Sequence, residues 1–382
     1  MRFEFATAAR VIFGAGTLQE LPAAAAAMGK RPLLVMRRSM DLRRIPVTGV
    51  PFAIHGEPTV DLVSRAIQLA RDEACDMVIA VGGGSAIDCG KAIAALLANG
   101  GDPLDYLEVI GHGRPLTLPS APFIAVPTTA GTGSEVTRNA VLASPADHVK
   151  ASLRSPHMLP RLALVDPQLT LDLPPAVTAS TGLDALTQLI EPYVSIRANP
   201  LTDLYCAEGM RWAAGALRRA FGNPRDLEAR MDMSFASLLG GLALANAGLG
   251  AVHGFASPLG GMFDAPHGAL CAALLPHAMR VNVSALRAAA RTETLGRYAA
   301  VARTLTGRAD ATPDDGANWV ACLCRDLDVR PLSAYGVRQS DVSAVAAAAA
   351  RASSMKANPI VLPKEQLEEL LAAAIGSGPD GD

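Results

Sequence analysis

In the first 165 residues, short apolar runs alternate with stretches of helical periodicity, and this alternation limits the fold more than any other feature. The runs are short enough for strands buried on both faces, and they lie at 32–36, 77–81, 123–126 and 161–165. Residues 59–74 show helical spacing between the first two. Two more short strands are expected near the N-terminus, around Phe3 and over 11–13. Alternating strands and helices predict a parallel α/β sheet with right-handed crossovers.

The pattern changes after Pro167, where apolar runs give way to long helical patterns that continue to about Ala374. We therefore expect two domains, an α/β domain over 1–168 and an all-helical domain over 169–382. The uncharged stretch 233–252 is long enough to span a bilayer. Its glycines and polar residues instead favour a buried core helix.

The charge and the cysteines exclude several classes of partner. The formal net charge is −2, which gives no electrostatic reason to expect nucleic acid or an anionic membrane. The N-terminus lacks the uninterrupted apolar segment of a secretory signal. The six cysteines include no CxxC pair, which is typical of reduced thiols. We therefore expect a cytoplasmic protein that binds neither nucleic acid nor membrane.

Two loops that follow apolar strands combine glycines with hydroxyl groups. The first, GGGS at 82–85, precedes a helix, and we expect Ser85 to cap that helix with Asp88 as the acid three residues later. Its composition also suits an ordinary tight turn. The second loop, 127–135, reads PTTAGTGSE. Because open α/β sheets bind ligands at the carboxyl ends of their strands, the two loops together predict a phosphate-containing ligand.

Two histidines and a carboxylate form a second candidate site. His253 and His267 belong to a mostly apolar segment in which Pro258 is expected to break the helix. Upstream, Asp184 and Gln188 are four residues apart and therefore share one face of a helix. Imidazole and carboxylate groups are common ligands of divalent cations. The alternative for each histidine is a buried core residue with its hydrogen bonds satisfied.

These segments, in this order along nearly the whole chain, resemble the motifs of the iron-containing (group III) alcohol dehydrogenases. They are the loops at 82–85 and 127–135, GLDALTQ at 182–188, and the histidine segment 253–267. The resemblance implies an α/β dinucleotide-binding domain and an all-helical metal-binding domain, the architecture shared with dehydroquinate synthase. It also implies a homodimer, because family members commonly pair through their N-terminal strands.

In that family, one aspartate and three histidines hold a divalent ion. The resemblance assigns Asp184, His253 and His267 to three of these positions and places Gln188 at that of the first histidine. An amide oxygen is a weaker ligand than imidazole. Glycerol dehydrogenases of the same superfamily also lack this histidine and use an Asp/His/His zinc site. The expected metal is therefore Fe²⁺ or Zn²⁺.

The resemblance also implies a nicotinamide dinucleotide as cofactor. The residues that it assigns to the cofactor are Gly83, Gly84, Ser85, Asp88, Thr128, Thr129 and Lys150. Related enzymes that prefer NAD often carry an aspartate after the first strand, where this chain has Arg37 and Arg38. Because arginine accommodates a 2′-phosphate, we expect NADP as well as NAD to be accepted. The alternative is that both arginines are merely solvated.

A second departure from the family concerns proton transfer. Many members have a histidine four residues after the position of His253, where this chain has Ser257. Proton transfer by a positioned histidine is worth ~10²–10⁴-fold in rate. His277 lies in the same region, but a structural role at a helix start is an equal alternative. The catalytic base is therefore unassigned, with Ser257 and His277 as candidates.

The expected reaction is reversible hydride transfer between a small-molecule alcohol and NAD(P)⁺, with the metal as Lewis acid. Three alternatives stay open: a maleylacetate reductase, a dehydroquinate-synthase-like lyase, and a catalytically silent nucleotide-binding homologue. The sequence does not identify the substrate.

Overall fold

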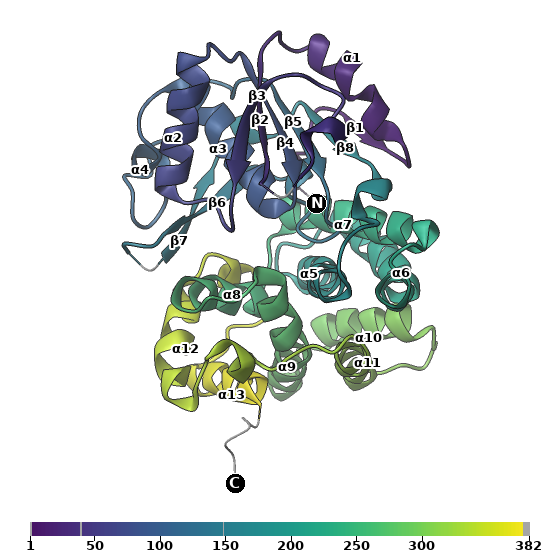
Figure 1. The fold of residues 1–382 in the computed structure, drawn as a ribbon. Helices are drawn as coiled ribbons and strands as arrows, with labels where there is room; N and C mark the ends of the chain where they lie inside the picture. Colours follow the sequence, from purple (N-terminus) through teal and green to yellow (C-terminus); the bar gives the residue numbers. More distant parts are fainter. Residues whose placement is uncertain (1, 39, 148, 377–382) are drawn as a thin grey trace. The chain divides into compact units, whose positions relative to one another are not determined.

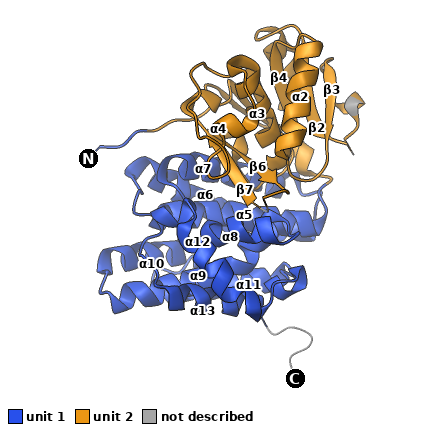
Figure 2. Ribbon diagram, turned by 90° about the vertical axis from the view of Figure 1, so that its left-hand side faces the viewer, with its two compact units in different colours: residues 1–4, 173–382 blue, residues 5–172 orange. Residues whose placement is uncertain are grey.

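Two compact units make up the protein. The structure, a computed structural model, describes residues 2–38, 40–147 and 149–376. One unit spans Phe5–Asp172, and the other begins at Leu173 and also takes in residues 2–4 (Figure 2). Mixed α/β structure therefore gives way to helices at Leu173.

A six-stranded parallel sheet is the framework of the first unit (Figure 1). Its order is β1-β8-β5-β4-β2-β3, and every neighbouring pair is parallel. The strands are β1 Val11–Phe13, β2 Pro32–Arg37, β3 Val50–Ile54, β4 Met77–Gly82, β5 Phe123–Pro127 and β8 Leu162–Val165. The predicted parallel α/β sheet is confirmed.

Helices cover both faces of this sheet. They are α1 Leu21–Ala26, α2 Val60–Asp72, α3 Gly84–Asn99 and the short α4 Pro103–Tyr106. Side chains alternate along β2, so Leu33 and Val35 pack with α2 and α3, whereas Leu34 and Met36 pack on the face covered by α1. Burial of both faces explains why the central strands read as continuous apolar runs.

Three strands were not predicted, and one predicted strand is absent. The unpredicted strands are β3 and the antiparallel hairpin of β6 Asn139–Ser144 with β7 Val149–Arg154. The edge strand β3 tolerates Pro51 because a proline at an edge removes no central ladder bond. The prediction of a strand around Phe3 is wrong, since no described strand pairs with that segment, whereas β1 pairs with β8.

Every regular element in the described part of the second unit is helical, as predicted. The α-helices are α5 Pro175–Val194, α6 Pro200–Gly222, α7 Leu227–Ala247, α8 Ala251–Met262, α9 His267–Ala288, α10 Thr292–Thr306, α11 Pro313–Asp326, α12 Val342–Arg351 and α13 Lys364–Ile375. Helix α5 packs against α6, α7 and α9, and α8 packs against α9 and α12. These contacts bring α5, α8 and α9 together.

Two apolar segments of this unit are core helices. Helix α9 is long and apolar enough to cross a bilayer by length and composition, but 78% of its most apolar window is buried inside the protein. The stretch 233–252, expected to form one buried core helix, instead covers the end of α7 and the start of α8, which meet at a bend of 96°. Helix α8 continues through Pro258, contrary to the predicted break. Proline there removes only the helical bond to the carbonyl of Gly254, and the helix proceeds to Met262.

Candidate active site

Four potential metal ligands converge within the helical unit. Asp184, His253, His267 and Cys271 each offer one atom, and these atoms all lie within 4.8 Å of one another. Among the residues that the structure describes, this is the one group of His, Cys, Asp and Glu with such spacing. The structure therefore brings three predicted ligands together and adds Cys271, which was not predicted.

Three helices supply these side chains. Asp184 and Gln188 lie one turn apart in α5, and His253 lies in the first turn of α8. His267 is the first residue of α9, and Cys271 follows it by one turn. Because residues four apart share a helix face, the packing of α5 and α8 against α9 is sufficient to gather them.

Two buried oxygen atoms on one face of α5 lack hydrogen-bond partners. Asp184 Oδ1 and Gln188 Oε1 are buried and have none among the described residues. His253 Nε2 lies 3.4 Å and His267 Nε2 lies 3.8 Å from Asp184 Oδ1. Unpartnered buried oxygens are costly, and a cation would satisfy them. The residues therefore fit a divalent cation.

Glu191 orients His253 from the opposite side of the ring. Its Oε2 lies 2.6 Å from His253 Nδ1, and its Oε1 accepts a hydrogen bond of 2.7 Å from the N–H of Val252. A carboxylate only accepts, so Nδ1 carries the proton of the neutral ring, and Nε2 faces Asp184 with a free lone pair. Histidines that bind metals usually have such a second partner.

The charged groups of the cluster shift one another's pKa values. Burial lowers the pKa of His253, but Cys271 and Glu191 raise it, and the result lies well above the ordinary value. Burial raises the pKa of Asp184, but the two imidazoles hold it below its ordinary value. The cluster therefore favours a positive charge, whether a proton or a metal ion.

The glycine turn of the first unit leads directly from strand to helix. Strand β4 ends at Gly82, and α3 begins at Gly84 with Gly83 as its N-cap and no side-chain cap. The prediction that Ser85 caps the helix is therefore wrong, because the helix starts before Ser85. Gly83 offers no side-chain acceptor to the N–H groups of the first turn, an arrangement that favours an anion.

The glycine turn and the loop at 127–135 contact each other. A Cβ atom on Gly84 would lie 2.7 Å from Thr132 Cγ2, and one on Gly83 would lie 3.2 Å from Thr129 Oγ1. The N–H of Thr128 donates to the last carbonyl of β4 at 2.9 Å. Both loops thus lie at the carboxyl edge of the sheet, and a side chain at Gly84 would force Thr132 to move.

Asp88 joins α3 to the second loop. One of its oxygens accepts a hydrogen bond from the Ser134 hydroxyl, and the other accepts one of 2.9 Å from the N–H of Val141. The ammonium group of Lys91 lies 3.2 Å from Asp88 Oδ1. Since both oxygens have protein partners, the observed role of Asp88 is to position the loop. Its contact with a cofactor stays a prediction.

Lys91 is a buried cation that the sequence did not reveal. Its ammonium donates to Thr137 Oγ1 at 2.8 Å and to the carbonyl of Asn139 at 2.6 Å. Burial lowers the pKa of Lys91, although Asp88 opposes the shift. Burial also raises the pKa of the neighbouring Glu135 to about 7. This network connects α3 to the second loop and to β6.

Two predicted cofactor residues carry positive charge. Lys150 in β7 forms an ion pair of 2.6 Å with Glu57, so its ammonium already has a protein partner. Arg37 is exposed at the end of β2, and the pairing of β2 with β4 puts it beside the start of the turn at 82–85. Arg37 thus shares an edge of the sheet with the glycine turn.

Comparison with known proteins identifies the family. The sequence profile described as iron-containing alcohol dehydrogenase matches residues 8–167. The profile of the Fe-containing alcohol dehydrogenase family, C-terminal, matches residues 178–375. The chain belongs to the iron-containing alcohol dehydrogenase family.

Individual members resemble this alcohol dehydrogenase over most of their length. Alcohol dehydrogenase 4 of Schizosaccharomyces pombe is 36% identical over 323 residues, which are 84% of this chain and 74% of the relative. The crystal structure of a 1,3-propanediol oxidoreductase has a TM-score of 0.90 and 32% identity, covering 98% of this chain and 100% of that one.

A third relative, sulfoacetaldehyde reductase from Bifidobacterium kashiwanohense, was solved in complex with NAD⁺. Its TM-score is 0.86 at 28% identity, covering 99% of this chain and 100% of that one. These matches confirm the resemblance, the fold class and the expected activity. The chain is an oxidoreductase that acts on CH–OH groups, and its family uses NAD(H) and a divalent metal.

The two candidates for proton transfer in this alcohol dehydrogenase lie in different places. Ser257 is exposed and follows His253 by one turn of α8. His277 lies about 15 Å beyond His267 along α9, at a rise of 1.5 Å per residue. It lines a separate hollow with Arg280, and burial lowers its pKa. The structure therefore does not bring His277 to the cluster.

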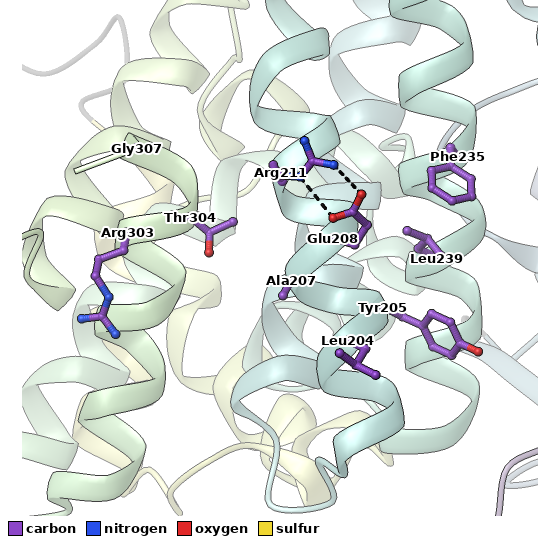
Figure 3. Close-up of a pocket in the computed structure, with 10 residues that line it drawn as sticks. All are labelled: Leu204, Tyr205, Ala207, Glu208, Arg211, Phe235, Leu239, Arg303, Thr304 and Gly307. Carbon is purple, nitrogen blue, oxygen red and sulfur yellow. Dashed lines mark hydrogen bonds and ion pairs between the residues drawn. The ribbon is translucent and has the colours of Figure 1, made fainter. Parts of the chain in front are cut away.

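A hollow between α6, α7 and α10 is also separate from the ligand cluster (Figure 3). Leu204, Phe235 and Leu239 give it an apolar lining, and Arg211 pairs with Glu208 beside them. None of the predicted metal or cofactor residues lines it. The hollow is therefore no candidate for the alcohol site.

Helical spacing places the two residues missed near the histidines on faces that bear a predicted ligand, but it does not show which side chains they contact. Cys271 follows His267 by four residues, and Glu191 follows Asp184 by seven, so each shares the face that bears a ligand. A cysteine in an apolar helix usually packs as a small apolar residue. Its position beside the histidines distinguishes Cys271 from that class.

Proposed function

We propose that this alcohol dehydrogenase holds a divalent cation on Asp184, His253 and His267, with Gln188 beside them. With it, the enzyme transfers hydride reversibly between a small-molecule alcohol and a nicotinamide cofactor. The observation that supports this is the cluster in which the unpartnered Asp184 Oδ1 lies next to two imidazoles, with the unpartnered Gln188 Oε1 one turn away on α5. A cation there supplies Lewis acidity toward an alcohol or carbonyl oxygen.

The chain's own residues orient the groups and carry the proton. Oxidation of the alcohol moves a hydride from carbon to the nicotinamide and releases the hydroxyl proton, and reduction of the aldehyde reverses both transfers. Glu191 keeps His253 Nε2 directed toward Asp184. We infer that the proton passes through the exposed Ser257 hydroxyl and water, because no histidine stands at that position.

The two glycine loops are the proposed cofactor site. The N–H groups at the start of α3 suit the pyrophosphate, because a helix N-terminus favours negative charge. The residues proposed to contact the dinucleotide are Gly83, Gly84, Ser85, Asp88, Thr128, Thr129 and Lys150. The close packing of Gly83, Gly84 and Thr128 at the carboxyl edge of β4 and β5 supports this assignment.

Arg37 is proposed to let the enzyme accept NADP(H) as well as NAD(H). Its exposed side chain at the end of β2 can pair with a 2′-phosphate, whereas an acidic residue would repel it. Substitution Arg37→Asp is expected to raise the KM for NADP by about 10-fold or more without raising that for NAD. Equal effects on the two KM values would contradict the assignment.

We further propose the identity of the metal, the domain roles and the assembly. The metal is Fe²⁺ or Zn²⁺, and residues 1–168 and 169–382 are the dinucleotide-binding and metal-binding domains. The enzyme acts in the cytoplasm as a homodimer. Light scattering on the eluate of a size-exclusion column measures the mass in solution, and a monomer at micromolar concentration contradicts the dimer.

Metal analysis and steady-state kinetics test the proposed function together. Protein purified without chelator is expected to contain about one divalent ion per chain. It is expected to oxidise or reduce members of an alcohol and aldehyde panel, with maleylacetate included, using NAD(H) or NADP(H). The variant Asp184→Asn should lose metal and activity while keeping its circular dichroism spectrum and its NAD binding.

Three outcomes would overturn this proposal. Redox inactivity with both cofactors, despite bound Fe²⁺ or Zn²⁺, excludes the dehydrogenase reaction. Tight nucleotide binding without stoichiometric metal or turnover indicates a silent homologue. Turnover without net change in the absorbance of the reduced nicotinamide indicates a lyase.

A further inference from the structure

Cys271 lies among the ligand atoms of the cluster, whereas an ordinary buried cysteine packs as a small apolar residue. Its Sγ lies 3.6 Å from His267 Nε2 and 3.9 Å from His253 Nε2. Both nitrogens also face Asp184 Oδ1. The thiol is therefore adjacent to the same atoms that are proposed to bind the cation.

Four of the six distances among these atoms approach the spacing around one tetrahedral ion, and the other two are no longer than 4.8 Å. Zinc bonds of about 2.3 Å to sulfur and about 2.0–2.1 Å to nitrogen or oxygen separate tetrahedral ligands by roughly 3.3–3.6 Å. The distances to Asp184 Oδ1 are 3.4 Å from His253 Nε2 and 3.8 Å from His267 Nε2. With the two sulfur distances of 3.6 and 3.9 Å, all four lie within a few tenths of an ångström of that range.

The chemistry of the donors indicates which ion this chain prefers. Gln188 offers a neutral amide oxygen, so the chain lacks a third imidazole. Thiolate is a stronger zinc ligand than an amide oxygen, and soft sulfur ligands suit Zn²⁺, whereas mononuclear Fe²⁺ sites typically use histidine and carboxylate ligands. We propose that Cys271 is the fourth metal ligand and that it makes the site an Asp-His-His-Cys centre selective for Zn²⁺ over Fe²⁺. This inference rests on the proposed metal site and specifies its composition.

The other buried cysteines provide an internal comparison. Cys206 in α6 is also free and fully buried, but it is not a member of the ligand group. A buried thiol by itself therefore does not produce the arrangement at Cys271. Cys206 is the matched control, because its removal deletes a buried thiol from the same helical unit and leaves the cluster intact.

Cobalt substitution tests the sulfur–metal bond directly. Metal-free protein loaded with one equivalent of Co²⁺ is expected to show a near-ultraviolet sulfur-to-cobalt charge-transfer band and strong visible bands of tetrahedral cobalt. The variant Cys271→Ser should lose the charge-transfer band, and Cys206→Ala and Gln188→Ala should retain it. Zinc affinity of Cys271→Ser should fall at least ~10-fold, with a smaller fall in affinity for Fe²⁺.

The outcomes separate this inference from the proposed function. If wild-type protein binds Co²⁺ stoichiometrically and turns over without the band, Cys271 is not a ligand and the dehydrogenase proposal stands. Retention of the band in Cys271→Ser has the same meaning. If wild-type protein binds neither Co²⁺ nor Zn²⁺, the proposed metal site itself fails. Circular dichroism and NAD binding show whether Cys271→Ser is folded, and Cys271→Ala replaces it if it is not.

Discussion

Replacing Glu191 with glutamine isolates the effect of histidine orientation on metal binding. Both carboxylate oxygens are in use, one at 2.6 Å from His253 Nδ1 and one at 2.7 Å from the N–H of Val252. Glutamine has the same size but only one acceptor atom. Its oxygen must remain with the fixed backbone N–H, so its amide N–H group faces Nδ1. The ring proton then moves to Nε2, the atom that faces Asp184.

The expected cost follows from this change of tautomer. A protonated Nε2 cannot bind a metal, so binding first requires that the ring turn or exchange its proton. Loss of such a partner of a metal-binding histidine typically weakens metal affinity 10–100-fold, or about 1.4–2.7 kcal/mol. We expect Glu191→Gln to fall in this range, with a normal KM for NAD.

Competition for Zn²⁺ against a chromophoric chelator measures this affinity. Glu208→Gln is the matched control, because both oxygens of Glu208 are also hydrogen-bonded, to Arg211 and Trp212, and Glu208 is not a member of the ligand cluster. That variant should bind zinc as wild type does. Zinc affinity within about twofold of wild type for Glu191→Gln would refute the reasoning and indicate that packing alone orients His253.

Two further predictions concern Gly84 and Glu135 in the first unit, with Gly215 of α6 in the second unit for comparison. Gly84→Ala should raise the KM for NAD by about 10-fold and leave metal content unchanged, since the new Cβ would lie 2.7 Å from Thr132 Cγ2. An unchanged KM for NAD in Gly84→Ala would contradict this expectation. By contrast, no atom lies within 4 Å of the Cβ that Gly215→Ala would add, so that variant should stabilise α6 by about 0.5–1 kcal/mol. Burial raises the pKa of Glu135 from 4.5 to about 7, so the folded state binds the proton more tightly than the unfolded state does. Its contribution to the free energy of unfolding is complete below pH 4.5 and declines by up to about 3 kcal/mol as pH rises to 7. Urea titrations of wild type and Glu135→Gln from pH 4 to 8 should show this decline in wild type alone, and parallel curves would be inconsistent with it.

The sequence predicted the parallel sheet because its central strands are buried on both faces. Such strands form continuous apolar runs. The runs at 77–81 and 123–126 lie within the observed strands β4 and β5. The edge strand β3 was missed because it alternates between exposed and buried positions and contains Pro51. The cap at Ser85 was mispredicted because propensity favours serine, whereas the direct passage from β4 into α3 starts the helix earlier.

Within the ligand cluster, the sequence predicted only those residues whose types are unusual in an apolar core. Asp184 and the two histidines are unusual in apolar helices, so their pattern was visible in the sequence. Cys271 was not visible, because a buried cysteine is normally a small apolar residue. Glu191 was missed because its function depends on which side of the His253 ring it meets. That relation is set by the packing of α5 and α8 and is not encoded in local spacing.

The cluster also affects how the helical unit unfolds. Its side chains come from α5, α8 and α9, which are distant along the chain, so a bound ion is a reversible cross-link between them. Such a ligand adds its binding free energy to the stability of the folded state, about 2.7 kcal/mol at 100 times its Kd. If the proposed site holds the ion, a shortage of metal would lower the enzyme's resistance to unfolding and proteolysis as well as its activity, and its abundance in cells would then follow the supply of the ion.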